Sequence, residues 1–323
     1  PYHRCDFRIT IHGMNPKTKR LYIPRLKLVG MFFLCVAVII IGTKLVVWGK
    51  RVMDETKLTP GPVIRLLFDS GAPLQATGGR TNILLLGIAG GSHPGSDLTD
   101  TMMILSFAPE NRTLAFISLP RDIWSETLQD KINSAYHYGE EKKKGGGLVL
   151  AKTIVEDVSG LPIHYGVVVD FSGFTKVIDL VGGVDVAVAE SFTDPQFPVA
   201  GRENDECGGD PKLLCRYEAL HFEKGREHMD GELALKYVRS RHAQGEEGSD
   251  FARSRRQQEV LLALKEKFMS PFSWISPFRV GSLLRAVDEA TDTDMKIGEA
   301  LTIGKMLVKT PGGAIKKISI EDL

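Results

Sequence analysis

The chain has 323 residues, of which 43% are hydrophobic and 25% are charged, so it can form one large folded domain with a short appendage. Its 41 basic residues are almost balanced by 40 acidic ones. This balance gives no support for binding nucleic acid through the surface as a whole, and any basic site must come from local clustering.

One long hydrophobic run lies near the N-terminus. Residues 28–48 contain about twenty mostly apolar residues interrupted by Lys44, which is the length that a helix needs to cross a bilayer. A helix buried in a soluble domain and a cleaved signal peptide are the alternatives. The run is longer than the hydrophobic part of a signal peptide, and no A-x-A cleavage site follows it, so we predict a transmembrane helix at 28–48.

The flanks of this run indicate its orientation. Residues 1–27 contain seven lysines and arginines and one acidic residue, and the positive-inside rule places them in the cytoplasm. Everything after the helix is then extracytoplasmic and attached to the cell membrane by a single pass. This cytoplasmic tail is too short for a DNA-binding domain, so we expect no nucleic-acid partner.

A connector rich in proline and glycine spans 49–79, and apolar strand patterns then alternate with helical ones. This alternation predicts an α/β fold, namely an α-β-α sandwich with a central mixed sheet, over residues 80–305, followed by a C-terminal tail at 306–323. The predicted strands are 81–88, 102–107, 113–118, 165–169 and 184–188, and the predicted helices are 147–158, 171–181, 231–238, 251–268, 282–290 and 297–308.

Cys207 and Cys215 lie in one loop rich in glycine and aspartate. If this loop is outside the cytoplasm, a local disulfide between them is expected. Two unpaired thiols in a flexible loop are the alternative.

Two polar segments flank predicted strands. The first, GSDLTDT at 95–101, brings Asp97 and Asp100 close to the start of a strand, where carboxylates can hold a hard cation. On this segment alone, capping of a turn is the commoner role for such residues. The second, SLPRD, places Arg121 and Asp122 just after the end of a strand, where functional loops gather in α/β folds, although an isolated pair of this kind is more often a surface ion pair.

Arginines recur in two later segments. In YVRSRH, Arg239 and Arg241 would face the same side of an extended backbone, and no acidic residue lies within this segment. In DFARSRRQQ, helical spacing would place Arg253, Arg256 and Gln257 on one face, with Asp250 above Arg253, while Arg255 points elsewhere and is solvated.

Arginine, rather than lysine, is the informative residue type in these segments. Its planar guanidinium binds two phosphate oxygens at once and stays charged at any accessible pH. Several arginines on one pocket wall would suit a diphosphate. A charged helix face exposed to solvent is the alternative.

Seven stretches together make the chain resemble the LytR-CpsA-Psr family of cell-envelope phosphotransferases. They are NILLLGI, LTDTMMILSF, SLPRDI, KINSAYHYG, VVVDFSGFTKVIDLVGGVDV, HMDGELALKYVRSRH and DFARSRRQQ, and they occur in the family's order over about residues 80–305. The resemblance implies a hydrophobic pocket for a polyprenyl chain, with the lipid pyrophosphate at its mouth. It also implies Mg²⁺-assisted transfer of a phosphate-linked anionic glycopolymer from a polyprenyl-diphosphate carrier to a cell-wall acceptor such as peptidoglycan.

The resemblance also implies roles for individual residues. Asp100 corresponds to the family's metal-associated aspartate, and Arg121 to an arginine that contacts the pyrophosphate. Asp122 would orient Arg121 or act as a base, and these two roles stay open. The rest of the polar wall corresponds to Arg239, Arg241, Arg253, Arg256 and Gln257.

The chain departs from the family pattern near the expected metal site. Ala89 stands where the family often has aspartate, and Leu98 and Thr99 stand where it often has Arg-Ser. Either Asp97 replaces a missing ligand, or the metal has fewer protein ligands. A hydrolase acting on the same lipids and a non-catalytic binding protein for polyprenyl phosphates are the alternative functions.

Overall fold

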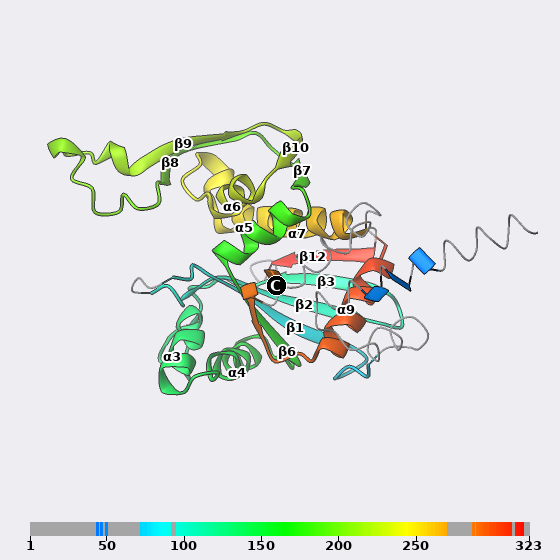
Figure 1. Ribbon diagram of the computed structural model, residues 1–323. Helices are drawn as coiled ribbons and strands as arrows, with labels where there is room; N and C mark the ends of the chain where they lie inside the picture. Colours follow the sequence, from blue (N-terminus) through cyan, green and yellow to red (C-terminus); the bar gives the residue numbers. More distant parts are fainter. Residues whose placement is uncertain are drawn as a thin grey trace, which may run out of the picture. The chain divides into compact units, whose positions relative to one another are not determined.

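The computed structural model describes residues 43–44, 46–47, 49–50, 72–91, 95–269, 286–287, 289–311 and 314–319. The chain forms two units, Pro1–Arg51 and Val52–Leu323, and every helix and strand named below belongs to the second (Figure 1). No helix within the described ranges has the length and apolar character needed to cross a bilayer. The predicted transmembrane helix at 28–48 and the tail at 1–27 lie largely or wholly outside these ranges.

A six-stranded mixed sheet forms the centre of the second unit. In spatial order its strands are β11 (Thr291–Thr293), β6 (Tyr165–Asp170), β1 (Thr81–Ile88), β2 (Thr99–Ala108), β3 (Thr113–Ser118) and β12 (Ile315–Ser319). β1 pairs parallel with β6 and antiparallel with β2, and β12 pairs parallel with β3. β2 pairs antiparallel with β3, and β11 pairs antiparallel with β6. The predicted mixed sheet is confirmed.

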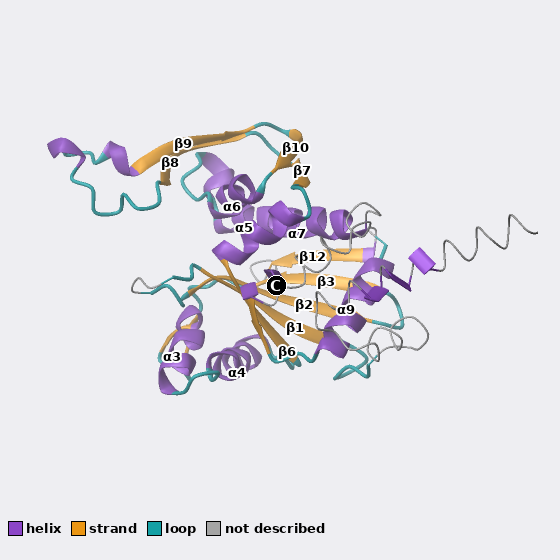
Figure 2. Cartoon of the chain, viewed as in Figure 1, coloured by secondary structure: helices purple, strands orange, loops and turns teal. Residues whose placement is uncertain are grey.

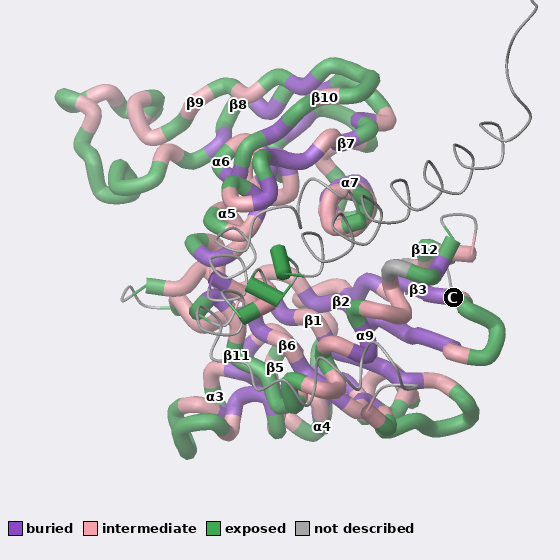
Figure 3. Tube along the Cα trace, turned by 45° about the vertical axis from the view of Figure 1, so that its right-hand side comes forward, coloured by how far each residue is buried: buried purple, intermediate pink, exposed green. Residues whose placement is uncertain are grey.

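Helices cover both faces of this sheet (Figure 2). They are α3 (Ala135–Lys142) and α4 (Gly147–Ser159) on one face, and α7 (Asp250–Met269) and α9 (Ile297–Lys309) on the other. Because successive side chains of a strand point to opposite faces, Leu84 packs against α3 and α4, whereas Ile83 packs against α7 and α9. Both faces of β1 are therefore apolar, and buried residues run along the strands in Figure 3. The predicted α-β-α sandwich is confirmed.

A second hydrophobic cluster lies beside the sheet. Its elements are α5 (Phe171–Leu180), β7 (Val184–Val188), β10 (Gly225–Met229), α6 (Gly231–Arg239) and the middle of α7. α5 and α6 begin where Asp170 and Asp230 accept hydrogen bonds from backbone N–H groups of the first turn. α5 thus starts directly at the end of β6, which joins this cluster to the sheet.

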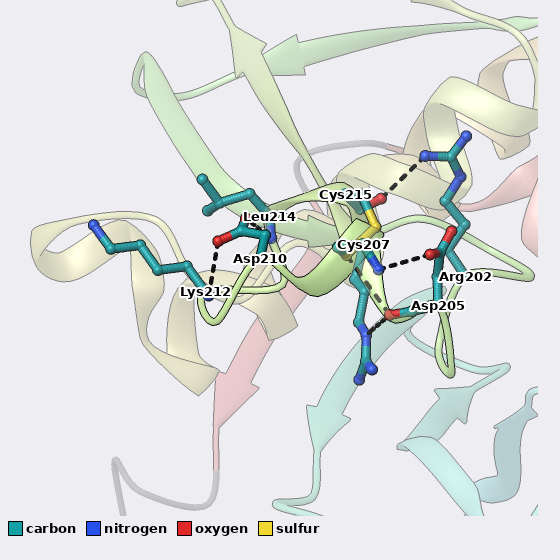
Figure 4. Close-up of a disulfide and its surroundings, with 8 residues drawn as sticks. Arg202, Asp205, Cys207, Asp210, Lys212, Leu214 and Cys215 are labelled. Atoms are coloured by element: carbon teal, nitrogen blue, oxygen red, sulfur yellow. Dashed lines mark hydrogen bonds between the residues drawn. A yellow bond between two sulfur atoms is a disulfide. The ribbon is translucent and has the colours of Figure 1, made fainter.

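A hairpin of β8 (Phe192–Pro198) and β9 (Tyr217–Phe222) projects away from the sheet in Figure 1. Cys207 and Cys215 form a disulfide near its tip, which confirms the expected local pairing (Figure 4). The backbone N–H of Cys207 donates to Asp205 at 2.8 Å, and the guanidinium of Arg202 donates to the carbonyl oxygen of Cys215 at 3.3 Å. The tip is therefore held by a covalent bond and by hydrogen bonds.

The remaining elements are short. They are β4 (Trp124–Ser125), β5 (Asp130–Lys131) and the 3₁₀ helices η1 (Ile132–Ser134), η2 (Cys207–Gly209), η3 (Leu214–Arg216) and η4 (Gly245–Gly248). The sequence analysis did not predict these elements, nor α3, β8, β9, β10, β11 or β12. β12 lies in the segment 306–323 that was expected to be a tail, and it adds a parallel strand to the sheet. Most of the predicted helix at 282–290 is outside the described residues.

Gly231 lies where α6 packs closely against α5. A Cβ atom at this position would lie 2.3 Å from the carbonyl oxygen of Thr175 in α5. We expect Gly231→Ala to lower the free energy of unfolding by about 1–3 kcal/mol, because backbone atoms would have to move. Gly304→Ala in α9 is the matched control, since no atom lies within 4 Å of the added Cβ.

The control should raise the free energy of unfolding by up to about 1 kcal/mol, because alanine favours the helix. Denaturant unfolding of the full chain measures both variants. Equal changes in the two variants would contradict the close packing of α5 against α6.

Candidate active site

An apolar pocket lies between the sheet and the helices α5, α6 and α7. Its empty space is about 650 Å³, including the part that opens to solvent. The sheet contributes Leu85, Met103 and Val169, and the helices contribute Phe174, Leu235 and Leu261. At one edge stand Thr101 and Gln257, whose side chains are joined by a hydrogen bond of 2.9 Å. Such a pocket can hold a long hydrocarbon chain.

A polar pocket of about 670 Å³ adjoins the apolar one. The two share Thr101, Val238, Gln257 and Phe171 in their linings. The structure brings five of the predicted site residues to this second pocket, namely Asp100, Arg239, Arg241, Arg253 and Gln257. A ligand with an apolar tail and an anionic head would fit the two pockets together.

Two of the arginines have no acidic partner within the described part of the chain. The guanidinium of Arg239 lies over the ring of Phe171, 4.7 Å from its centroid, and burial lowers its pKa, partly offset by the charge of Asp100. Arg241 is exposed at the polar pocket. The expected extended backbone is wrong at Arg239, because α6 continues to that residue. Ser240 then ends the helix, and both side chains still line one pocket.

Asp194 of β8 holds the segment that carries Arg241. Its fully buried carboxylate accepts hydrogen bonds from the Ser240 hydroxyl at 2.7 Å and from the backbone N–H groups of Arg241 and His242 at 2.9 and 3.1 Å. Burial raises the pKa of this carboxyl, but these hydrogen bonds outweigh burial, and the pKa is lowered overall. Asp194 was not predicted, because it lies 47 residues before Arg241 in the sequence and belongs to no recognisable motif.

Arg253 and Gln257 of α7 face the polar pocket as predicted. Arg253 is 10% exposed at its side chain and forms an ion pair of 2.8 Å with Asp250, as expected from their spacing. Burial lowers the pKa of Arg253, the charge of Asp250 opposes this shift, and the charges of Arg241 and Arg121 lower the pKa further. An anion in the pocket would offset this crowding of positive charge.

Arg256 does not share this polar wall, contrary to expectation. Its guanidinium is fully buried, where it donates to the carbonyl oxygen of Ser240 at 2.7 Å and pairs with Glu247 at 3.1 Å. Helical residues are about 100° apart, so Arg253 and Gln257 lie about 40° from each other while Arg256 is turned to the other side of Arg253. Arg255 is not simply solvated either, because it forms an ion pair with Glu247.

Asp100 and Arg121 meet at the end of the sheet. Asp100 is in β2 rather than in the predicted turn, and its carboxylate forms an ion pair with the guanidinium of Arg121, which follows β3. The Nε atom of Arg121 lies 3.5 Å from Asp122, whose other oxygen is 2.6 Å from the Nζ atom of Lys131. Lys131, first of all, and Arg121 lower the pKa of Asp122 despite its partial burial. A lowered pKa makes Asp122 a weaker base than an ordinary aspartate, and its contacts suit the role of orienting Arg121.

Asp97 lies apart from Asp100's pocket. Its carboxylate is 2.8 Å from the Nδ1 atom of His137, and this hydrogen bond raises the pKa of the histidine. Neither residue lines the polar or the apolar pocket. In the ranges that the structure describes, the one group of three candidate metal ligands includes Cys207 and Cys215, which are already joined in the disulfide.

The donor set at the polar pocket fits Mg²⁺ only in part. Asp100 supplies one carboxylate with a side chain 43% exposed, and Arg121 contacts one of its oxygens. Mg²⁺ is commonly held by one or two carboxylates together with phosphate oxygens and waters. The polar pocket thus offers Asp100 as one carboxylate of this kind, and Asp97 is not placed beside it as a second ligand.

Comparisons with known proteins identify relatives of this chain by sequence and by fold. A profile of the LytR_cpsA_psr family matches residues 60–322. The polyisoprenyl-teichoic acid–peptidoglycan teichoic acid transferase TagU of Bacillus mycoides is 31% identical over 220 residues, 66% of this chain and 60% of that protein. TagV of Bacillus subtilis, which has the same activity in its name, is 30% identical over 246 residues, 74% of this chain and 56% of that protein. The match therefore spans less than two thirds of either relative.

The crystal structure of Bacillus subtilis TagV has a similar fold. It superposes with a TM-score of 0.54 at 28% identity, and the match covers 76% of this chain and 85% of that chain.

The free energy of unfolding should distinguish an arginine that stabilises the fold from one that only lines the pocket. We expect Arg256→Met to lower the free energy of unfolding by about 3 kcal/mol, the low end for breaking a buried ion pair, because Glu247 keeps its contact with Arg255. Arg241→Met should change it by less than about 0.5 kcal/mol, since Arg241 is exposed and has no acidic partner among the described residues. Denaturant unfolding measures both. A similar loss in both variants would contradict this division.

Protonation of Asp194 should make the free energy of unfolding depend on pH under acidic conditions. The pKa of Asp194 in the folded protein is lower than the ordinary value of 3.8. The contribution of its carboxylate to the free energy of unfolding is therefore complete above that ordinary value and is lost as pH falls through the folded pKa. We expect wild type to be more stable than Asp194→Asn at pH 7, with the difference shrinking below about pH 4. Unfolding free energies of both proteins across this range test the prediction, and a difference that stays constant with pH would refute it.

Proposed function

The chain belongs to the LytR_cpsA_psr family, and on this premise we propose that it is a phosphotransferase. The reaction is transfer of a phosphate-linked anionic glycopolymer from a polyprenyl-diphosphate carrier to a cell-wall acceptor, peptidoglycan. The observation that carries the proposal is the apolar pocket whose adjoining polar pocket is lined by Arg239, Arg241 and Arg253. The names of the relatives TagU and TagV describe a reaction of this class.

The arginines provide the site for the diphosphate. Arg239 and Arg253 are buried enough to lower their pKa values, which means that removing their charges from water is costly in the absence of an anion. A bound diphosphate offsets that cost through charge-assisted hydrogen bonds. The polyprenyl chain then extends into the apolar pocket past Thr101 and Gln257, which line both pockets.

The reaction requires no nucleotide, because the carrier already contains the activated phosphoanhydride bond. A hydroxyl oxygen of the acceptor forms a bond to the phosphorus next to the glycan. The bond from that phosphorus to the bridging oxygen breaks, the lipid monophosphate leaves with the electron pair, and the hydroxyl proton passes to solvent. Arg239, Arg241 and Arg253 stabilise the charge on the phosphate oxygens during this exchange.

Asp100 would hold Mg²⁺ together with phosphate oxygens and waters. When bound, the ion supplies additional neutralisation of phosphate charge. Arg121 contacts Asp100 and fixes the orientation of its carboxylate, and Asp122 in turn holds Arg121. These three residues thus act as a positioned unit next to the phosphates.

We place the enzyme on the outer side of the cell membrane, anchored by the hydrophobic run at 28–48. The basic flank at 1–27 supports this orientation. The disulfide between Cys207 and Cys215 supports an oxidising compartment for the folded domain.

A transfer assay on the full chain tests the proposal. A polyprenyl-diphosphate glycan with radiolabel in the sugar is incubated with peptidoglycan oligomers and Mg²⁺. We expect label on the oligomers, and we expect Arg239→Ala to lower the rate about 100-fold or more, because a group aimed at the phosphate charge is lost. Arg226→Ala is the matched control: this arginine is exposed on β10, lies 4.0 Å from Asp185 and lines neither pocket. Its rate should equal that of wild type.

Further arms of this assay separate metal, hydrolysis and binding. EDTA and Asp100→Ala should each abolish transfer if Asp100 holds Mg²⁺. Release of free phosphorylated glycan in the presence of oligomers would identify a hydrolase instead. Tight binding of the lipid without any new product would identify a carrier protein and overturn the transferase.

A further inference from the structure

Trp124 is an exposed aromatic side chain with no role in the site described so far. It is 54% exposed, more than any other phenylalanine, tyrosine or tryptophan that the structure describes. Exposing a large apolar ring to water is unfavourable, and tryptophan is enriched at binding surfaces. The surroundings of Trp124 indicate what it binds.

Backbone hydrogen bonds hold the segment around Trp124. Trp124 in β4 pairs with Lys131 in β5, and the backbone N–H of Ile132 donates to the carbonyl oxygen of Ile123 at 2.9 Å. The next residue, Ser125, is 1% exposed, and Ile123 packs against the core beside α3 and α4. Because its neighbours in the chain point inward, Trp124 is held facing outward, so little conformational freedom is lost when a ligand covers its ring.

One backbone pairing and a series of ion pairs connect Trp124 to Asp100 at the polar pocket. Lys131, its cross-strand partner, pairs with Asp122, and Asp122 contacts Arg121. Arg121 in turn pairs with Asp100, which lines the pocket. Trp124 follows Arg121 by three residues, so their Cα atoms are at most about 11 Å apart. This distance is on the scale of two sugar rings.

The residue that precedes Trp124 packs on the face of the sheet opposite the apolar pocket. Ile123 packs with α3 and α4, whereas Leu85, Met103 and Leu261 of the pocket lining pack on the face covered by α7. Trp124, Asp122 and Lys131 line neither the apolar nor the polar pocket. In phosphoryl transfer the attacking and leaving oxygens lie roughly in line, so an acceptor would approach from the side opposite the lipid phosphate.

The chemistry of this surface matches a sugar ring. A pyranose has an apolar face of C–H groups, which an indole can cover, and hydroxyl groups around its rim, which hydrogen-bond to charged side chains. Lys131 and Asp122 provide one positive and one negative charge beside Trp124. Their charges cancel, so the surface has no preference for a polyanion such as the polymer of the donor.

Resting on the proposed transfer reaction, we propose that Trp124 is a specificity-determining residue for the acceptor. One N-acetylhexosamine ring of a glycan strand stacks on its indole, with Lys131 and Asp122 at the rim of the ring. This places a neighbouring sugar hydroxyl beside Arg121 and Asp100, where the phosphate is transferred.

Titration of the full chain with a β-1,4-linked N-acetylglucosamine tetrasaccharide and with peptide-free peptidoglycan oligosaccharides, in the absence of donor, tests this assignment. Trp124→Ala should weaken the affinity for both by about tenfold or more, and Trp124→Phe should stay within about threefold of wild type, because the phenyl ring keeps the stacking surface. Leu214→Ala is the matched control, since Leu214 is 58% exposed on the hairpin arm. It should bind as wild type does.

Steady-state transfer provides the second readout. The KM for the acceptor should rise about tenfold in Trp124→Ala, while the KM for the donor and kcat at saturating acceptor stay within about twofold. Unaltered sugar affinity in Trp124→Ala, absence of sugar binding by wild type, or a rise in the donor KM instead would each overturn the assignment. Because the titration needs no turnover, sugar binding that depends on Trp124 in a protein without transferase activity would sink the proposed reaction and leave this surface standing.

Discussion

The buried guanidinium of Arg256 is the contact on which the geometry of the polar pocket depends. It joins the carbonyl oxygen of Ser240, at the end of α6, to Glu247, just before α7 begins, and its carbon lies 4.6 Å from the ring centroid of Phe192 in β8. The end of α6, the turn before α7 and the more distant strand β8 are thus tied at one point. The same β8 strand carries Asp194, which holds the backbone of Arg241. The positions of the arginines that line the polar pocket therefore depend on Arg256, which does not line it.

This arrangement separates arginines by their partners. Arg255 and Arg256 share the carboxylate of Glu247, whereas Arg239 and Arg241 reach the polar pocket without any acidic partner among the described residues. A buried charge without a partner is costly, and this applies to Arg239, whose pKa is lowered by burial, whereas Arg241 is exposed. Both arginines line the polar pocket that adjoins the apolar one, so the two halves of an amphipathic substrate would be recognised by neighbouring surfaces.

The two faces of the sheet separate the two proposed substrates. The apolar pocket lies on the face covered by α7, and Ile123, beside Trp124, packs on the face covered by α3 and α4. In the proposed reaction Asp100, at the start of β2, would lie next to the phosphorus that is exchanged. A lipid and a polysaccharide, which differ in chemistry and size, would then approach one reactive centre without competing for space.

The sequence by itself predicted the sandwich from apolar periodicity, and its arginine-rich motifs indicated Arg239, Arg241 and Arg253, which line the polar pocket. It favoured the pairing of Cys207 with Cys215 from their short spacing in one loop, with two free thiols as the alternative, and the structure contains the disulfide. It could not predict the hairpin of β8 and β9 or the strand β12, whose stability comes from partners far along the chain. Only the tertiary structure decided that Arg256 is buried, that Asp194 organises Arg241, and that Asp97 contacts His137 rather than sharing Asp100's pocket. The physical reason is that a charged side chain takes its role from the partners brought to it by folding, and those partners are not its neighbours in the sequence.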